Sequence, residues 1–218
     1  MKPDITLYGI LDPQIANGRP LADLAVAAVR GGVTLLQYRA KTADTRTMVN
    51  EVRAILSALP GSNVPLLVND RVDVALSAGA HGVHLGRDDM RPADARRLLG
   101  PEAIIGATAK SGDDLAALGA EPVDYICIGG VFATQHKDNP DAPLGLDGYR
   151  ILRAEARRAF GNLPVGAIAG IDATNAAALI EAGADGVAVI GALFATGDVE
   201  ASSRMLSQVI ADARRSPQ

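Results

Sequence analysis

Short runs of apolar residues recur along the chain, and each is followed by a segment whose apolar residues are three or four positions apart. A continuous apolar run of about four to eight residues is typical of a strand buried on both faces, whereas the wider spacing is typical of a helix that buries one face. The pattern therefore predicts alternating strands and helices. Eight strands are predicted, at residues 5–11, 33–38, 65–68, 82–85, 103–107, 123–128, 165–168 and 186–190.

Capping and turn residues mark where the predicted elements meet. Asp44, Ser111 and Asp172 stand at the starts of helical segments, where short polar side chains accept hydrogen bonds from free backbone N–H groups. Gly79 and Gly183 each follow a helical segment and precede a strand, as expected where a helix ends in a sharp turn. The chain is therefore built from a repeated strand–helix unit.

Eight such units in 218 residues average about 27 residues each, close to the length of a strand–helix repeat. Continuous apolar strands are what a parallel sheet covered on both faces needs, so eight such units predict an α/β fold, a single closed (β/α)8 barrel of the TIM-barrel type. An open doubly wound sheet is the alternative, but no Gly-x-Gly-x-x-Gly follows the first strand and no change in composition marks a second domain. We expect one domain over residues 1–218, with a frayed C-terminal tail from about residue 214.

Composition and charge narrow the class of protein. Hydrophobic residues make up 48% of the chain and charged residues 21%, which excludes a disordered chain or a small disulfide-stabilised protein. The net charge is −4 without a Lys/Arg tract, so we expect small-molecule substrates and no nucleic acid or membrane as partner. Cys127 is the single cysteine and lies in an apolar run, which favours a buried thiol in a reducing compartment. We expect a cytoplasmic protein, and whether it forms a homo-oligomer is left open.

Polar residues gather just after the predicted strands, where a barrel of this type places its functional groups. The chain has only four lysines, and Lys41, Lys110 and Lys137 follow the second, fifth and sixth predicted strands. Loops are polar in most proteins, which accounts for any one of these lysines. Three together favour the binding of an anion at this end of the barrel.

Two carboxylates are candidates for a metal site. Asp70 and Asp89 follow neighbouring predicted strands, and Mg²⁺ prefers carboxylate and phosphate oxygens as ligands. From the residues alone, a helix N-cap for Asp70 and a surface ion pair for Asp89 are the simpler interpretations. Asp88 is equally acidic, so spacing does not choose between it and Asp89.

Glycine turns after the last two predicted strands are candidates for a phosphate site. Gly170 and Gly191 each stand before a helical segment, and the free N–H groups at helix starts bind phosphate in many barrels. Turn geometry alone also accounts for glycine at these positions. Two such turns on adjacent units favour a phosphate pocket.

Five motifs resemble those of the thiamine phosphate synthase family in order and spacing, and the resemblance extends from Leu7 to about Leu193. The motifs lie at residues 31–41, 68–75, 82–90, 105–108 and 132–137. The family joins a pyrimidine that carries a methylene diphosphate to a thiazole phosphate, releasing pyrophosphate and giving thiamine phosphate, in a Mg²⁺-dependent alkyl transfer. The resemblance therefore implies a transferase of thiamine biosynthesis with Mg²⁺ as cofactor.

The resemblance also implies roles for single residues. It places the metal on Asp70 and Asp89, and it places Thr108 near the reacting groups. The residues expected to hold the pyrimidine diphosphate are Gln37, Arg39, Lys41, Asn69 and Lys137. Those expected around the thiazole phosphate are Thr134, His136, Gly170, Ile190 and Gly191. The residues expected to assist the chemical step are Arg39, Lys41, Thr108 and Lys137.

A charge count supports this assignment. The count includes Arg39, Lys41 and Lys137, together with the metal ion, Asp70 and Asp89. Their net charge is about +3, which would meet a diphosphate of roughly −3. Without the metal, the carboxylates would repel the substrate. We therefore expect activity to require Mg²⁺, with no side-chain nucleophile.

Some positions depart from the family pattern. Arg87 stands where the family commonly has Gln, Ala169 where Gly is common, and Gly191 where Ser is common. His136 replaces a hydroxyl residue beside Lys137. Most of these changes fall on the thiazole phosphate side, so its affinity and the preferred thiazole isomer are left open.

Two alternative functions are kept. A thiazole tautomerase of the same superfamily shares the barrel and the thiazole phosphate pocket, but Gly130 occupies the place where its functional histidine is expected. A non-catalytic sensor of a phosphate ligand would account for the altered thiazole side.

Two further features are predicted. We expect the loop at 129–145 to act as a lid that excludes water from the site. We expect His84 to be a hydrogen-bonded residue of the barrel.

Overall fold

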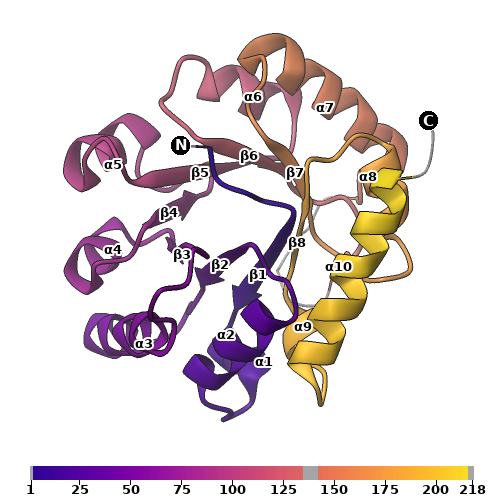
Figure 1. Ribbon diagram of the computed structural model, residues 1–218. Helices are drawn as coiled ribbons and strands as arrows, with labels where there is room; N and C mark the ends of the chain where they lie inside the picture. Colours follow the sequence, from indigo (N-terminus) through magenta and orange to yellow (C-terminus); the bar gives the residue numbers. More distant parts are fainter. Residues whose placement is uncertain (1, 135–141, 216–218) are drawn as a thin grey trace.

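Eight parallel strands close into a barrel in sequence order, with β1 paired to both β2 and β8 (Figure 1). The computed structural model describes residues 2–134 and 142–215. The predicted (β/α)8 barrel is therefore confirmed. The strands are β1 (Leu7–Leu11), β2 (Leu35–Tyr38), β3 (Leu66–Asn69), β4 (Gly82–Leu85), β5 (Ile104–Ala109), β6 (Tyr125–Ile128), β7 (Val165–Ile168) and β8 (Val187–Val189).

Helices surround the barrel and carry the chain from the end of one strand to the start of the next (Figure 1). α10 packs against α8 and α2 and so closes the ring, while the short helices α1 and α9 contact each other. No helix in residues 2–134 or 142–215 is long and apolar enough to cross a membrane. The helices are α1 (Pro13–Ala16), α2 (Leu21–Arg30), α3 (Thr45–Ala58), α4 (Val72–Ala78), α5 (Pro92–Leu99), α6 (Gly112–Leu118), α7 (Gly145–Phe160), α8 (Ala176–Glu181), α9 (Gly191–Phe194) and α10 (Val199–Arg215).

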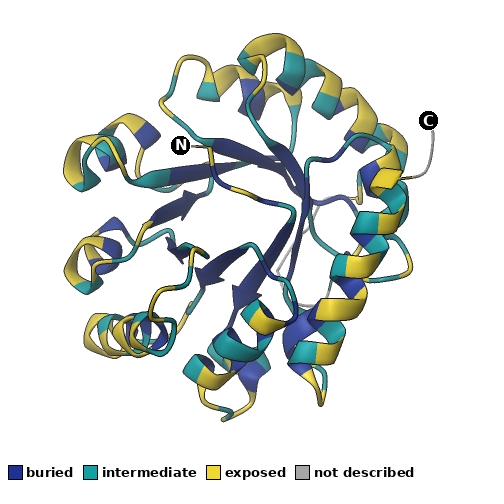
Figure 2. Ribbon diagram, viewed as in Figure 1, coloured by how far each residue is buried: buried dark blue, intermediate teal, exposed yellow. Residues whose placement is uncertain are grey.

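The core has two layers because successive strand residues point to opposite faces. In β1, Tyr8 and Ile10 pack inside the barrel, whereas Leu7 and Leu11 pack outward against the helices. Cys127 is free and buried in the inner layer, which confirms the predicted thiol. Figure 2 shows the buried strands enclosed by helices whose outer faces are exposed. Because side chains fill the barrel interior, we expect a ligand to bind at one of its mouths.

Several predicted boundaries move by a few residues. Asp44 and Ser111 cap α3 and α6 as predicted, since their side chains accept hydrogen bonds from backbone N–H groups. The cap predicted at Asp172 is wrong: α8 begins later, after Asn175, and Asp172 instead accepts a hydrogen bond from the backbone N–H of Thr174 in the preceding turn. At the C-terminus α10 continues through Arg215, beyond the start of the expected tail, and residues 216–218 lie outside the described part.

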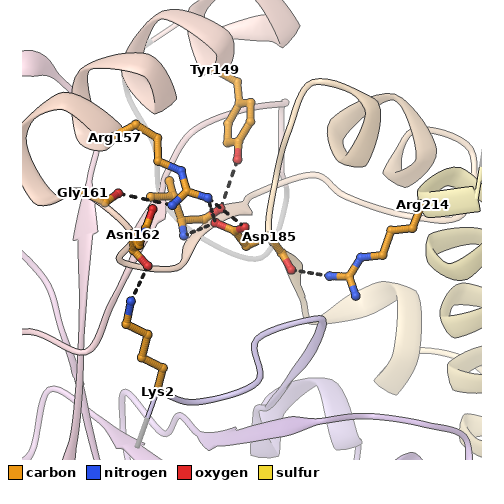
Figure 3. Close-up of polar contacts among 8 residues, drawn as sticks. Lys2, Tyr149, Arg157, Gly161, Asn162, Asp185 and Arg214 are labelled. Atoms are coloured by element: carbon orange, nitrogen blue, oxygen red, sulfur yellow. Dashed lines mark hydrogen bonds and ion pairs between the residues drawn. The ribbon is translucent and has the colours of Figure 1, made fainter. Parts of the chain in front are cut away.

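A cluster at the amino-terminal mouth ties α7 and α10 to the ends of β7 and β8 (Figure 3). The Asp185 carboxylate accepts a hydrogen bond of 2.8 Å from the Val165 N–H and forms an ion pair with Arg157. Arg214 donates to the Asp185 carbonyl, and Lys2 donates to the Asn162 carbonyl nearby. These contacts join structural elements to one another. Barrels of this type have their functional groups at the carboxyl ends of the strands, so we expect the functional site at the opposite mouth.

Candidate active site at the carboxyl mouth of the barrel

Lys41, Asp70 and Asp89 meet at the carboxyl ends of β2, β3 and β4. The Lys41 Nζ atom lies 2.5 Å from Asp70 Oδ2, and the Asp70 and Asp89 carboxyl groups hydrogen-bond each other. Asp89 Oδ2 also accepts a hydrogen bond of 2.6 Å from the Gly86 N–H, which fixes its loop. Three side chains that are distant in sequence thus form one polar cluster.

The two carboxyl groups have opposite pKa shifts. Burial raises the pKa of Asp89, and its hydrogen bond to Asp70 raises it further. Burial also acts to raise the pKa of Asp70, but the hydrogen bonds to Asp89 and Lys41 outweigh burial and hold that pKa below its ordinary value. Two adjacent carboxylates cannot both be ionised cheaply, so of the two groups Asp89 takes up a proton first as the pH falls.

Among the described residues, the structure shows neither a helix N-cap at Asp70 nor a surface ion pair at Asp89, the simpler interpretations of these two aspartates. The N-cap residue of α4 is Arg71, and Asp70 has a left-handed backbone with a φ of 61°. That conformation is uncommon outside glycine and turns the side chain toward Lys41 and Asp89 rather than the helix. Asp88 is exposed, whereas Asp89 is partly buried beside Asp70. Geometry therefore selects Asp89 over its neighbour.

Arg39 forms an ion pair that the sequence analysis did not predict. Its Nη1 atom lies 2.5 Å from Asp12 Oδ2, and both side chains are largely buried. Asp12 follows β1 directly, so the rule used to find the other residues, polar groups just after a strand, would also have found it. With Asp12 included, the net charge expected at the mouth falls from about +3 to about +2.

Gln37 and Thr108 stand at the two ends of a hydrogen-bonded chain across the barrel interior. Gln37 donates to the Tyr8 hydroxyl, and the hydroxyls of Tyr8 and Tyr125 are 2.8 Å apart. His84 lies 2.8 Å from the Tyr125 hydroxyl through Nδ1 and 2.7 Å from Thr108 Oγ1 through Nε2. Burial raises the pKa of both tyrosines, so they stay neutral. The prediction of a hydrogen-bonded barrel role for His84 is confirmed.

Asn69 and Thr108 were predicted to lie just beyond their strands, but both lie within them. Asn69 is the last residue of β3, and Thr108 is the penultimate residue of β5. Thr108 still reaches the mouth, where it lines a cavity of about 560 Å³ together with Lys110 and Arg87. Both residues therefore remain at the carboxyl end of the barrel.

Four of the residues expected around a thiazole phosphate line one cavity of about 400 Å³ beyond β7 and β8, namely Thr134, Gly170, Ile190 and Gly191. Gly170 has a φ of 65°, and a Cβ there would lie 2.3 Å from the Ala133 carbonyl oxygen. The chain therefore needs glycine at this close approach. Ala169 has a φ of 94°, which is strained for a residue with a Cβ.

Two predicted site residues and part of the predicted lid lie outside the described residues. His136 and Lys137 fall within 135–141, as does the middle of the loop expected to act as a lid. Their roles stay predictions. The two described ends of this loop are hydrogen-bonded to each other. The Leu144 N–H donates to the Gly130 carbonyl, and the Gly145 N–H donates to the Val131 carbonyl.

Comparison with known proteins decides the family. A family model described as thiamine monophosphate synthase matches residues 7–193. The chain belongs to the thiamine monophosphate synthase family. It is 50% identical over 202 residues to the thiamine-phosphate synthase of Agrobacterium fabrum, covering 93% of this chain and 92% of that protein. It is 38% identical over 212 residues to that of Moorella thermoacetica, covering 97% and 99%.

Solved structures agree with the thiamine monophosphate synthase assignment. The thiamine phosphate pyrophosphorylase of Pyrococcus furiosus superposes with a TM-score of 0.83 and 31% identity, covering 97% of this chain and 98% of that one. A tryptophan synthase chain of Mycobacterium tuberculosis, 15% identical with a TM-score of 0.70, shares the fold. Thiamine-phosphate synthases are transferases, so the predicted family and enzyme class are confirmed.

Proposed function

We propose that the protein is a thiamine phosphate synthase that couples a pyrimidinylmethyl diphosphate to a thiazole phosphate, releasing pyrophosphate. The observation that carries the proposal is the cluster of Lys41, Asp70 and Asp89, with Arg39 also just after β2, at the same mouth as the glycine-turn cavity of β7 and β8. One group of residues suits a metal-bound diphosphate, and the other suits a second phosphate. A coupling reaction needs both.

The donor set of the cluster fits Mg²⁺. Asp70 and Asp89 supply hard oxygen ligands, and a bound cation would offset the repulsion between the two carboxylates that helps to raise the pKa of Asp89. Within residues 2–134 and 142–215 no group of three or more His, Cys, Asp or Glu side chains is placed to hold a metal. Two protein carboxylates with diphosphate oxygens and water completing the shell is the usual arrangement for this ion.

The chain's own residues act mainly on the leaving group. When bound, Mg²⁺ supplies positive charge to the diphosphate. The C–O bond at the pyrimidine methylene breaks with its electron pair on the diphosphate, and the electron-rich aminopyrimidine stabilises the resulting cation. Arg39 and Lys41 stabilise the departing charge, with Lys137 assigned the same role from the sequence. The thiazole nitrogen then donates its lone pair to the methylene carbon, forming the new C–N bond.

The polar chain through the barrel interior orients the pyrimidine side. Thr108 Oγ1 is held by His84, and Gln37 is held by Tyr8, so each side chain has a fixed direction before substrate binds. Asn69 at the end of β3 lies beside His84 in the strand register. Fixed donors cost little reorganisation during the reaction, which favours the transition state.

The phosphate of the thiazole is assigned to the β7–β8 cavity. Gly170, Gly191, Thr134 and Ile190 line this cavity, and the backbone N–H groups of the two glycines are the donors assigned to the phosphate. Gly191 lacks the hydroxyl common in the family, so its N–H is the remaining donor at that position. His136 is assigned to the same phosphate from the sequence.

Product analysis tests the proposal. The purified protein is incubated with both phosphorylated substrates and Mg²⁺, and then with each substrate omitted. We expect thiamine phosphate only when both are present. Isomerisation of the thiazole phosphate without the pyrimidine would support a tautomerase, and binding without turnover would support a phosphate sensor.

A further inference from the structure

The two oxygens of the Asp12 carboxylate accept hydrogen bonds from different partners. Oδ1 accepts a hydrogen bond of 3.0 Å from the Gln14 N–H and caps α1, whereas Oδ2 accepts from Arg39 Nη1 at 2.5 Å. The strand ladder brings the two residues together, because Leu11 pairs with Tyr38 and the Arg39 N–H donates to the Leu11 carbonyl at 2.8 Å. Asp12 thus stands beside Arg39 at the mouth.

The burial of this pair points to a task beyond stability. The side chain of Asp12 is 5% exposed and that of Arg39 is 11% exposed. The free energy needed to remove two charges from water is about as large as the free energy gained from their attraction. A pair of apolar side chains would therefore stabilise the fold equally well. The guanidinium has five N–H donors in a rigid plane, and among the described residues its side chain bonds only Asp12, through Nη1. Other donors are left for a ligand.

We propose that Asp12 is a positioning residue that holds the Arg39 guanidinium so that its remaining N–H groups face the diphosphate of the pyrimidine substrate. The inference rests on the proposed function. An arginine fork binds phosphate oxygens with two parallel hydrogen bonds only when its plane is correctly set. A carboxylate fixed at one oxygen by a helix cap provides a rigid anchor for that plane.

A double-mutant cycle tests this inference. Asp12→Asn keeps an oxygen for the Gln14 N–H, because Asn is also a good N-cap, but it removes the charge that holds Arg39. We expect kcat/KM for the pyrimidine diphosphate to fall by about 10- to 100-fold while KM for the thiazole phosphate stays unchanged. In an Arg39→Gln background, Asp12→Asn should change kcat/KM by less than about twofold. Asp12→Glu, which keeps the charge, should lose less activity than Asp12→Asn.

Asp185→Asn is the matched control, since Asp185 also accepts from a backbone N–H and an arginine, but at the opposite mouth. It should lower the melting temperature and leave kcat/KM unchanged at a temperature where it is folded. Equal losses from Asp12→Asn in both backgrounds, an unchanged kcat/KM, or the same loss in Asp185→Asn would overturn the inference.

A binding measurement separates this inference from the proposed function. Calorimetric titration with pyrophosphate in the presence of Mg²⁺ should show binding weakened by about tenfold or more in Asp12→Asn. If the wild type makes no thiamine phosphate, the proposed function fails, and this titration still tests Asp12. If the wild type is active and pyrophosphate binds both proteins equally, Asp12 does not position Arg39.

Discussion

Lys41 Nζ lies 2.5 Å from Asp70 Oδ2, so a side chain assigned to the diphosphate contacts a side chain assigned to the metal. The lysine is half exposed, with 49% of its side-chain surface accessible, and can move toward a ligand. In the absence of substrate it offsets the negative charge of the aspartate pair. Binding of a metal and a diphosphate would let Lys41 exchange one oxygen partner for another.

Asp89→Ala should abolish the Mg²⁺-dependent coupling, with a loss of at least about 100-fold in kcat, because one of two protein ligands is removed. The fold should persist, since Asp89 lies in a loop. Steady-state rates across a Mg²⁺ titration and circular dichroism measure the two effects. Asp88→Ala, which changes the exposed neighbouring carboxylate, is the control and should stay near wild type. Full activity in Asp89→Ala would refute the metal assignment.

Lys41→Ala should slow the departure of the diphosphate by about 10²-fold or more, since it removes charge from the leaving-group site. Single-turnover rates report this step directly. Lys2→Ala removes a lysine that bonds the Asn162 carbonyl at the other mouth, and it should leave the rate unchanged. We expect Lys137→Ala to resemble Lys41→Ala. A wild-type single-turnover rate in Lys41→Ala would contradict its role.

Mg²⁺ affinity should fall as the pH is lowered through the raised pKa of Asp89, because a proton then competes with the cation for that carboxylate. The low pKa of Asp70 keeps that group ionised over the same range. Binding should therefore release a proton, most clearly near the raised pKa of Asp89. Calorimetric titration with Mg²⁺ alone, in buffers of different ionisation enthalpy, measures both quantities. An affinity that does not change with pH would contradict the competition between proton and cation at Asp89.

Ala169→Gly should raise the free energy of unfolding by about 1 kcal/mol. The left-handed backbone at Ala169 costs about 1–3 kcal/mol in a residue with a Cβ, and added freedom of the unfolded chain offsets about 0.4–1 kcal/mol of the gain. Denaturant unfolding measures the change. Ala177→Gly, within α8, is the control and should destabilise by about 1 kcal/mol. Destabilisation by Ala169→Gly would show that the strain is absent.

Much of the fold follows from local patterns. The eight strands are short apolar runs. Such runs can be located in the sequence because a strand that is buried on both faces has apolar residues at successive positions. Strand ends are less certain, as β5 shows: Thr108 continues the strand because its neighbour Cys127 on β6 pairs with it. Pairing partners come from distant parts of the chain, so a local pattern cannot set these ends.

The site was predicted in outline because strand ends converge in a barrel. That reasoning brings Asp70 and Asp89 together, but it says nothing of the ion pair between Arg39 and Asp12, which depends on the register of β1 and β2. Tyr8 and Tyr125 were also missed. They lie within apolar strands, where an aromatic residue reads as core, and only the packed structure shows their hydroxyls bonded to polar side chains.

The most direct test follows pyrophosphate and thiamine phosphate together, with both substrates present and Mg²⁺ either supplied or chelated. We predict that the two products form in equal amounts with Mg²⁺ and that both fall by orders of magnitude when it is removed. Coupling that continues at an undiminished rate without a divalent cation, or pyrophosphate release without thiamine phosphate, would contradict the account.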